Sequence, residues 1–287
     1  MKKILVTGAT GNVGSALVKQ LAKNAEVELY LGVREPEKPR QQFADIPFHL
    51  CHLDFAQRIF PDTSVDAVFL MRPPHLGDPE LFRAYLSSLN PDTRVVFLSV
   101  QGADQMPYIP HAKIEKIILE MGFPHMFIRP GYFMENLLTT LCPELKENQR
   151  IYLPAGDLNF NWVAVEDIAR ASAAALTQDD VGSTVELSSS ENYDFEEVIG
   201  CINEICGTSF TYTSPSGLRY MAYSLKKGQK LTYIFVMLLL HYLPRLGQKQ
   251  SVTTTEDYAR LTGQKMTSLR DFIRQHKDFF QQLAISH

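Results

Sequence analysis

The segment Val6-Thr7-Gly8-Ala9-Thr10-Gly11-Asn12-Val13-Gly14 (VTGATGNVG) decides the fold of this chain. An apolar run, residues 4–7, leads into its glycines, and apolar residues recur with helical spacing from Val13 to Leu21. A buried strand that passes through a glycine-rich turn into an amphipathic helix is the opening unit of a parallel α/β sheet. The segment therefore predicts a strand, a tight loop and a helix, in that order.

The glycines of this loop are spaced as GxxGxxG, and each has a separate physical use. Gly8 suits the tight turn, Gly11 allows the backbone to approach a pyrophosphate, and Gly14 allows close packing of helix on strand. The free N–H groups and the positive dipole end of the helix stabilise an anion there. The predicted pyrophosphate contacts are Gly8, Thr10, Gly11, Asn12, Val13 and Gly14. A glycine-rich turn with a structural role only is the alternative.

Short apolar runs alternate with helical patterns in the first 130 residues, as in a parallel sheet covered on both faces. The predicted strands are 4–7, 28–33, 48–53, 67–71, 95–99 and 125–129. The fold class is α/β, a Rossmann-type doubly wound parallel sheet with a smaller C-terminal α+β substrate region. We expect 1–150 to form the nucleotide-binding domain, with sheet elements returning around 160–190, and 151–287 to form the substrate-binding region.

The regular alternation fades after residue 130. The expected strand fragments are 161–165, 184–187 and 210–213, and the expected helices are 218–227, 230–243 and 269–283. Asp194 is followed three residues later by Glu197, which is the spacing of a capping box with Asp in place of Ser or Thr. This pair predicts a helix that starts just after Asp194.

Composition excludes several classes of protein. The chain has 287 residues with 28 Lys+Arg against 32 Asp+Glu, a net charge of −4, so it lacks the excess of cations that a dedicated nucleic-acid binder needs. Its four cysteines, Cys51, Cys142, Cys201 and Cys206, show neither a disulfide-scaffold pattern nor zinc-site spacing. We expect no metal, reduced thiols and a cytoplasmic protein.

The most apolar segment, 233–240 (YIFVMLLL), is much shorter than the ~20 residues that span a bilayer. We expect a buried or pocket-lining helix there and no membrane partner. At the N-terminus only three apolar residues precede Thr7, which favours a buried strand over a signal peptide.

A cation marks the end of the second predicted strand. The residue that contacts the adenosine ribose is expected about 20 positions beyond the fingerprint, and Arg34 stands 20 residues after Gly14. An acid would bind the 2′-hydroxyl of NAD, whereas a guanidinium pairs with a 2′-phosphate. NADP(H) is therefore favoured over NAD(H). Lys38 is a further candidate contact, with a solvated loop as the alternative, and Asp54 is placed to accept a hydrogen bond from the adenine amino group.

Several segments together resemble the atypical short-chain dehydrogenase/reductase family, in particular its NmrA-like branch. They are VTGATGNVG, Arg34, Asp54, the segment HAKIEKIILEMGFPHMFIRPGYFMEN (111–136) and VEDIA (165–169). The order of His111, Glu115, Gly122, Arg129, Gly131 and Asn136 is similar to that of the NAD(P)H:quinone oxidoreductase and triphenylmethane reductase type. The resemblance covers nearly the whole chain, and it implies a cofactor-binding Rossmann domain and a small substrate domain.

The catalytic candidates depart from the Tyr-x-x-x-Lys pair of typical members. Tyr108 and Lys113 are five residues apart with Pro110 between them, so they are not expected on one helical face. Tyr108 is kept as a secondary candidate. His111 borders the buried side of the predicted helix near its amino end, where the dipole favours a neutral imidazole. The family resemblance places His111 at the position of the catalytic lysine of phenylpropanoid reductases, and a packing role is the alternative.

Further contacts are expected where strands end. Met71, Arg72, Ser99 and Gln101 follow the fourth and fifth strands, at the carboxyl edge where doubly wound sheets bind ligands. Arg72 is equally consistent with a surface cation. A flat acceptor needs apolar and aromatic walls. The substrate candidates are Tyr132, Phe133, Met134, Asn136, Tyr233 and Met237, with core packing as the competing interpretation.

These patterns together predict an NADP(H)-dependent oxidoreductase that transfers hydride to a small planar acceptor such as a quinone. The partner is a small-molecule substrate, and the protein is expected to be a monomer or a homodimer. A catalytically silent NADP(H) sensor of the NmrA type is the main alternative, because the Tyr-x-x-x-Lys pair is missing. A nucleotide-sugar epimerase is weakened by the same absence.

Overall fold

The computed structural model describes residues 1–179, 182–189, 191–246 and 256–285. A seven-stranded parallel sheet is its largest element, with strand order β10-β6-β5-β4-β1-β2-β3. The strands are β1 (Lys2–Thr7), β2 (Val27–Val33), β3 (His49–His52), β4 (Ala67–Met71), β5 (Arg94–Leu98), β6 (His125–Pro130) and β10 (Thr184–Leu187). The doubly wound parallel sheet predicted from the sequence is confirmed. The segment 184–187, expected as a strand fragment of the C-terminal region, is its seventh strand and pairs with β6.

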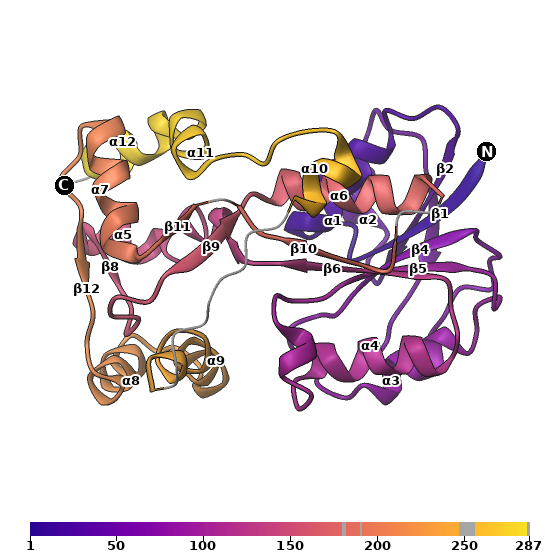
Figure 1. The fold of residues 1–287 in the computed structure, drawn as a ribbon, viewed down its shortest axis with the longest axis horizontal. Coiled ribbons are helices and arrows are strands. Elements are labelled where there is room, and N and C mark those ends of the chain that lie inside the picture. The colour runs from indigo at the N-terminus through magenta and orange to yellow at the C-terminus, as the bar shows by residue number, and fades with distance from the viewer. Residues whose placement is uncertain (180–181, 190, 247–255, 286–287) are drawn as a thin grey trace. The chain divides into compact units, whose positions relative to one another are not determined.

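Helices cover both faces of this sheet (Figure 1). One face carries α1 (Asn12–Leu21) and α6 (Val165–Thr177), and the other carries α3 (Glu80–Leu86) and α4 (Pro110–Glu120). Two shorter helices, α2 (Glu37–Gln42) and α10 (Asp257–Thr262), and a 3-10 turn η1 (Ala103–Gln105) complete this layer arrangement. Because the sheet is buried on both sides, its strands are continuously apolar: Ile4, Leu5 and Val6 are all at most 1% exposed.

The strand order creates a topological switch point. The chain runs outward from β1 through β2 to β3 and then returns to β4, on the other side of β1. The loops after β1 and β4 therefore leave the carboxyl edge of the sheet in opposite directions, and a crevice opens between them. This arrangement brings the glycine loop and Met71 together: the Met71 amide donates to the Thr7 hydroxyl at 2.9 Å.

Packing divides the described chain into two compact units. The first contains 1–131, 165–187 and 256–266, and the second contains 132–164, the described residues of 188–246, and 267–285. The sequence suggested a division at residue 150, with sheet elements returning around 160–190. The chain leaves the first unit earlier, at the end of β6, and returns to it through α6 and β10, because both elements pack on the main sheet.

The second unit is built from small sheets and helices. Strands β7 (Tyr132–Phe133), β9 (Phe160–Val163) and β11 (Asn192–Tyr193) form one sheet, and β8 (Arg150–Tyr152) pairs with β12 (Thr211–Thr213). The helices are α5 (Cys142–Asn148), α7 (Phe195–Cys206), α8 (Gly217–Lys226), α9 (Leu231–His241), α11 (Leu269–Gln275) and α12 (Lys277–Ile285), with 3-10 turns η2 (Met134–Leu137) and η3 (Leu243–Leu246). Their apolar side chains share one core around Trp162 and Phe195.

The predicted capping box is confirmed. The Asp194 side chain accepts from the Glu197 amide at 2.8 Å, and the Glu197 carboxylate accepts from the Asp194 amide at 2.9 Å. These reciprocal bonds satisfy two N–H groups that the first turn of α7 leaves without partners.

Two element boundaries differ from the expectation. The helix expected over 269–283 is broken at His276, whose φ of −110° and ψ of 21° leave the helical region, so α11 and α12 are separate. The strand expected over 161–165 ends at Val163, and Val165 already begins α6. Glu166 and Asp167 in its first turn favour this helix start electrostatically.

The apolar segment 233–240 lies in α9 and is only half buried. Ile234 and Met237 face the core of the second unit, at 2% and 5% exposure. Phe235 and Leu240 are exposed at 65% and 50%. Of the two expectations, a buried or a pocket-lining helix, the first holds for one side only, because the apolar residues cover the whole circumference and only one side is packed; Tyr233 and Met237 also line a small cavity. Among the described helices, none is both long and apolar enough to cross a membrane.

The closest packing of α1 on β1 yields a stability prediction. A Cβ on Gly14 would lie 2.2 Å from the Gly8 carbonyl oxygen and 2.9 Å from the Ala9 Cα, and both are backbone atoms that cannot rotate away. We expect Gly14→Ala to lower the free energy of unfolding by about 3 kcal/mol. The measurement is urea unfolding followed by circular dichroism.

Gly200→Ala is the matched control. Gly200 lies inside α7, and a Cβ added there would meet no atom within 4 Å, so alanine is expected to stabilise the protein by up to about 1 kcal/mol. Equal midpoints for the two variants would contradict the packing argument.

Candidate functional site

The glycine loop of the first unit has the geometry of an anion cradle. Gly8 adopts a φ of +63°, a conformation that side chains disfavour, and the Gly11 amide donates to the Gly8 carbonyl at 3.0 Å to close the turn. No side chain caps α1, and its first turn holds no acidic residue. The N–H groups at this helix start therefore remain available to an anion. Thr10 and Asn12 belong to the same loop.

Met71 closes one side of the loop. A Cβ on Gly8 would lie 2.2 Å from the Met71 Cε, so the thioether side chain already packs against the glycine backbone. Val13 is buried at 3% exposure on the helix side. The loop is thus held between α1 and the end of β4, as the topology requires.

The adenosine end of the predicted site lies at the carboxyl ends of β2 and β3. Arg34 is exposed, and its guanidinium forms no hydrogen bond or ion pair with another residue of the described part of the chain. Lys38 instead pairs with Glu35 at 2.9 Å. One oxygen of Asp54, Oδ1, accepts from the backbone of Ala56 at 2.8 Å and so shapes its own turn.

Ser99 stands at the end of β5 with an unpaired hydroxyl. It is 2% exposed, and its Oγ has no hydrogen-bond partner among the described residues. A buried hydroxyl without a partner costs free energy, and such groups mark places where a ligand or a water supplies the bond. Gln101 lies two residues later, and its amide donates to the Pro130 carbonyl at 3.1 Å.

His111 and Arg72 are hydrogen-bonded to each other, a contact between residues 39 positions apart that the sequence did not predict. The Arg72 Nε donates to the His111 Nε2 at 3.4 Å, so the imidazole proton lies on Nδ1. Burial, and secondly the charge of Arg72, lower the pKa of His111 to about 4. The imidazole is therefore neutral at physiological pH. The helix dipole was the predicted reason for this state, and burial is the larger cause.

Arg72 is anchored rather than a free surface cation. Its Nη1 donates to the backbone carbonyls of Pro73, Pro74 and Leu76, the last at 2.7 Å. Burial lowers its pKa from the usual value. These bonds hold the loop after β4 around the guanidinium and orient its Nε toward His111.

A buried ion-pair network fixes the helix that carries His111. Arg129, at the end of β6, donates through Nε and Nη2 to Glu115 at 3.0 and 2.7 Å, and through Nη1 to Glu186 at 3.1 Å. Although burial acts to lower the pKa of Arg129, these carboxylates raise it above the usual value. Glu115 lies one turn after His111 in α4, so the pair holds that turn against the sheet.

Glu115 and Arg129 belong to the family resemblance, but no local pattern in the sequence gives them a role. A charged residue inside an otherwise apolar strand or stripe was the available signal, because such a residue is buried only when paired. Glu115 interrupts the stripe of Ile114 and Ile117, and Arg129 ends the apolar run of β6.

Tyr108 lies outside helix α4, which begins at Pro110. Its side chain is 68% exposed, and Pro110 separates it from Lys113. The two residues therefore do not share a helical face, as the sequence indicated.

Comparison with known proteins agrees with this geometry. Residues 4–78 match the NAD dependent epimerase/dehydratase family. The chain is 26% identical over 239 residues to prestalk A differentiation protein A of Dictyostelium discoideum, covering 78% of this chain and 76% of that protein. It is 27% identical to the NAD(P)H azoreductase of Xenophilus azovorans, over 61% of this chain and 63% of the azoreductase.

Solved structures share the fold. The triphenylmethane reductase of Citrobacter sp., in complex with NADP(H), superposes with a TM-score of 0.77 at 21% identity, covering 95% of this chain and 99% of that one. The NADPH-dependent quinone oxidoreductase of Escherichia coli, in complex with NADPH, gives 0.78 at 19% identity with the same coverage. The chain is thus similar in sequence and in fold to NAD(P)H-dependent reductases of the atypical short-chain dehydrogenase/reductase type.

The matched segment 4–78 includes the glycine loop, Arg34, Asp54, Met71 and Arg72. These residues follow strands of one sheet, which places them along a single carboxyl edge. Ser99 and His111 follow β5 on the same edge and lie beyond the matched segment. No group of three or more His, Cys, Asp or Glu residues in the described part of the chain is arranged to hold a metal ion.

The predicted substrate residues lie in the second unit. Met134 is 1% exposed and Met237 is 5% exposed, and both belong to its core, so packing accounts for both. Phe133 and Asn136 are half-buried. Tyr233 contributes with Met237 to a small cavity of about 40 Å³, further lined by Tyr152, Tyr220 and Tyr223.

Tyr132 belongs to a buried aromatic cluster with a histidine that sequence reasoning did not select. Its ring lies 4.8 Å from that of Trp162 and 5.6 Å from that of His241. The His241 Nδ1 donates to the Met237 carbonyl at 2.9 Å, so its Nε2 accepts from the Tyr132 hydroxyl at 3.1 Å. The sequence signal that could have identified His241 is its position at the end of the apolar run 233–240.

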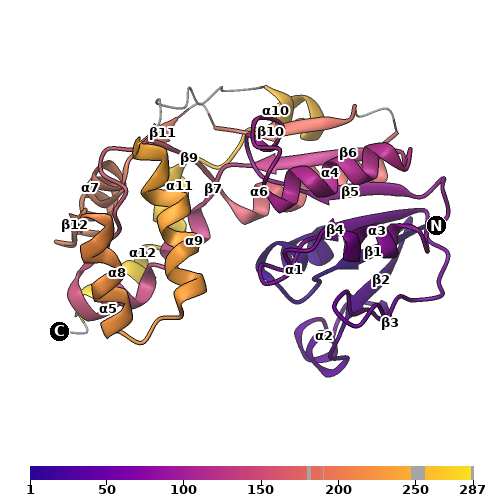
Figure 2. The ribbon, with the colours of Figure 1, turned by 90° about the horizontal axis from the view of Figure 1, so that it is seen from below.

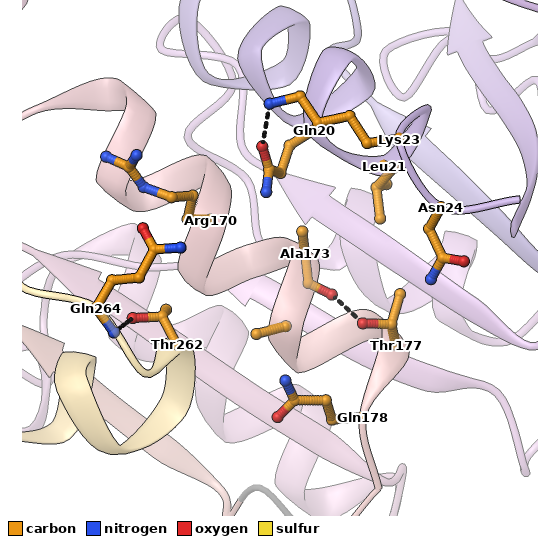
Figure 3. A pocket seen from close by; sticks show the side chains of 11 residues that line it. Gln20, Leu21, Lys23, Asn24, Arg170, Ala173, Thr177, Gln178, Thr262 and Gln264 are labelled. Atoms are coloured by element: carbon orange, nitrogen blue, oxygen red, sulfur yellow. Dashed lines mark hydrogen bonds between the residues drawn. The ribbon is translucent and has the colours of Figure 1, made fainter. Parts of the chain in front are cut away.

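A cavity of the first unit lies away from the glycine loop. Figure 3 shows this pocket of about 270 Å³ between the C-terminal end of α1, helix α6 and the loop after α10. Two of its polar side chains already have partners: Lys23 donates to Gln20 at 2.9 Å, and the Thr177 hydroxyl donates to the Ala173 carbonyl at 2.8 Å. Since the glycine loop is at the opposite end of α1, this pocket is not part of the nucleotide site.

The buried His241 yields a pH prediction. Burial lowers its pKa to about 4, whereas an unfolded histidine titrates near 6.5, so between these values only the unfolded chain takes up the proton. Stability therefore falls as the pH is lowered from 6.5 to 4, by about 3 kcal/mol from this residue. Denaturant unfolding at a series of pH values measures it.

His241→Phe removes the titrating group and is expected to flatten this part of the pH dependence. The matched control is His52→Phe, which replaces an exposed imidazole on β3. An unchanged slope in His241→Phe would show that other groups cause the acid lability.

Proposed function

We propose that this protein is an NADP(H)-dependent oxidoreductase that reduces a small planar acceptor of the quinone or dye type. The observation that carries the proposal is the glycine loop at the uncapped start of α1, where Gly8 and Gly14 leave no room for side chains. Such a loop binds a pyrophosphate through the backbone. The azoreductase, triphenylmethane reductase and quinone oxidoreductase named above support the reaction class.

The residues present fit a nicotinamide dinucleotide in two further respects. A Cβ on Gly8 would lie 2.2 Å from the Met71 Cε, and one on Gly11 would lie 3.3 Å from the Gly8 carbonyl oxygen, so the close packing of the loop requires glycine at both positions. The Ser99 hydroxyl is buried at the adjacent strand end, without a partner among the described residues. The loop would hold the pyrophosphate, and Ser99 would supply a hydrogen bond near the nicotinamide.

Arg34 supports the choice of NADP(H). Its guanidinium is exposed at the end of β2, where the ribose-reading residue of this fold stands, and is bonded to no other described residue. A planar cation matches a 2′-phosphate in charge and in hydrogen-bond geometry. Lys38 is held by Glu35 and contributes less.

His111 is the residue we assign to acceptor polarisation. A bound nicotinamide nucleotide supplies the hydride, so the protein has to position the acceptor and stabilise the charge that develops on it. The neutral His111 ring carries its proton on Nδ1, because Nε2 accepts from Arg72. That N–H is a fixed donor for an acceptor oxygen, and the Glu115–Arg129 pair keeps its helix in place.

Turnover distinguishes an enzyme from a sensor. We expect the purified protein to oxidise NADPH in the presence of at least one member of a quinone and dye panel. His111→Phe is expected to lower kcat about tenfold or more, because the donor to the acceptor is lost. The Kd for NADPH should change less than about threefold, because Arg72, which loses its bond to His111, is still held by three backbone carbonyls. Because its pKa is about 4, His111 should add no step to the rate between about pH 5.5 and 8.

His49→Phe, an exposed histidine at the amino end of β3 and so away from the carboxyl edge, is the matched control for this substitution and should retain the full rate. NADPH binding without turnover across the whole panel would reject the reductase and leave the silent sensor. Equal rates for His111→Phe and the unmodified protein would remove His111 from the reaction.

The cofactor preference is tested at Arg34. Arg34→Asp is expected to weaken NADPH binding by about tenfold or more, because a charged hydrogen-bond pair is lost and a repulsion is added, and to leave NADH binding equal or tighter. Isothermal titration with both nucleotides measures the ratio. Arg260→Asp, an exposed arginine on α10, is the control. An unchanged ratio in Arg34→Asp would discard the assignment.

A further inference from the structure

Helix α9 presents a continuous apolar stripe to solvent. Exposed positions recur every three to four residues along it, so they lie on one side of the helix. They are Leu231, Phe235, Val236, Leu239, Leu240 and, just beyond the helix, Leu243, which are 40–66% exposed. The opposite side is packed, with Ile234, Met237 and His241 at most 5% exposed. Isolated exposed apolar residues are ordinary, but a stripe of this length marks an interaction surface.

The neighbouring helix extends this apolar character. Helices α8 and α9 lie side by side in both views of the ribbon and are joined by the short turn 227–230 (Figure 2). Leu225 is 46% exposed just before the turn, and Leu231 is 66% exposed just after it. The tip of the helical pair is therefore apolar on both sides of its turn.

The charge of this region is opposite to that of the whole chain. Between Glu204 and Glu256 the sequence contains no Asp or Glu, although the net charge of the chain is −4. The same stretch contains Arg219, Lys226, Lys227, Lys230, Arg245 and Lys249. Lys227 pairs with Glu147 of α5 at 2.6 Å. Lys226 and Lys230 flank the turn, are exposed and form no ion pair with another described residue.

This combination identifies the kind of partner. Exposed leucine and phenylalanine beside unpaired lysines match a surface that is apolar beneath an anionic layer, which is the arrangement of an anionic lipid leaflet. The segment 205–255 of a second copy offers no carboxylate to these lysines, and the neighbouring Glu147 is already paired with Lys227. Charge complementarity therefore favours lipid over self-association.

We propose that the α8–α9 pair docks on the surface of an anionic membrane, with the exposed stripe of α9 in the acyl boundary and Lys226 and Lys230 among the lipid phosphates. Helix α9 has 11 residues and lies in the plane of the interface, because it is too short to cross a bilayer. The expectation of no membrane partner, which followed from the absence of a spanning segment, would then be replaced. The inference does not depend on the nucleotide site.

Vesicle flotation tests the proposal with the full chain. Vesicles of phosphatidylcholine with about 30% phosphatidylglycerol are expected to carry the protein upward, and pure phosphatidylcholine vesicles are expected to carry much less. Phe235→Ser with Leu239→Ser should abolish flotation, since the inserted side chains are lost. Leu119→Ser, on α4 of the first unit and 54% exposed, is the matched apolar control and should float normally.

The lysines are tested separately. Each cation near an anionic leaflet contributes about a fivefold factor in partitioning, so Lys226→Gln with Lys230→Gln should weaken binding to the anionic vesicles about 25-fold. Binding to the neutral vesicles should not change. Circular dichroism of each variant checks the fold, and because all four positions are exposed, native spectra are expected.

Three outcomes would overturn the proposal. They are absence of flotation on anionic vesicles, equal flotation on both vesicle types, and flotation that the double serine variant retains. Sedimentation velocity without lipid identifies the competing occupant: a dimer that Phe235→Ser with Leu239→Ser dissociates would assign the stripe to a second copy. NADPH titration of the same samples reports the nucleotide site independently, so failure of one proposal leaves the other measurable.

Discussion

The first unit depends on one contact, the approach of α1 to the end of β1 at Gly14. There the helix backbone lies so close to the Gly8 carbonyl that no side chain fits between them. This approach aims the start of α1 along the carboxyl edge of the sheet, and the positive φ of Gly8 turns the chain sharply enough to reach it. A backbone anion cradle follows from these two constraints, because the first N–H groups of an uncapped helix have no partner within the helix.

The rest of the candidate site is arranged by the switch in strand order. Since the chain passes from β3 back to β4 on the other side of β1, Met71 packs on the glycine loop and Arg72 reaches His111. The Arg129–Glu115 pair then fixes α4 against β6. The polar groups here are buried and mutually bonded, and a neutral imidazole results from burial beside a cation.

The second unit accommodates a buried histidine in an aromatic core. Its core is aromatic, with Tyr132, Trp162, Phe195 and His241 in contact, and His241 is tolerated inside it because both ring nitrogens are hydrogen-bonded. Helix α9 carries His241 on the side that packs in this core, and the opposite side of the helix is apolar and exposed. A helix that is apolar all round needs a partner on each side. This is the physical basis for treating the exposed stripe as an interaction surface.

The sequence by itself determined the strand–loop–helix opening, the six strands up to residue 130, the capping box at Asp194 and the positions at the carboxyl edge. These features follow from the periodicity of apolar residues, from the conformational freedom of glycine and from the order of the strands, all of which can be read from residues close together in the chain. Only the tertiary structure decided that 184–187 pairs with β6, that Arg72 contacts His111, that Arg129 pairs with Glu115, and which side of α9 is buried. Each of these contacts is between residues that are distant in the chain. Local sequence patterns cannot specify which distant residue a side chain contacts.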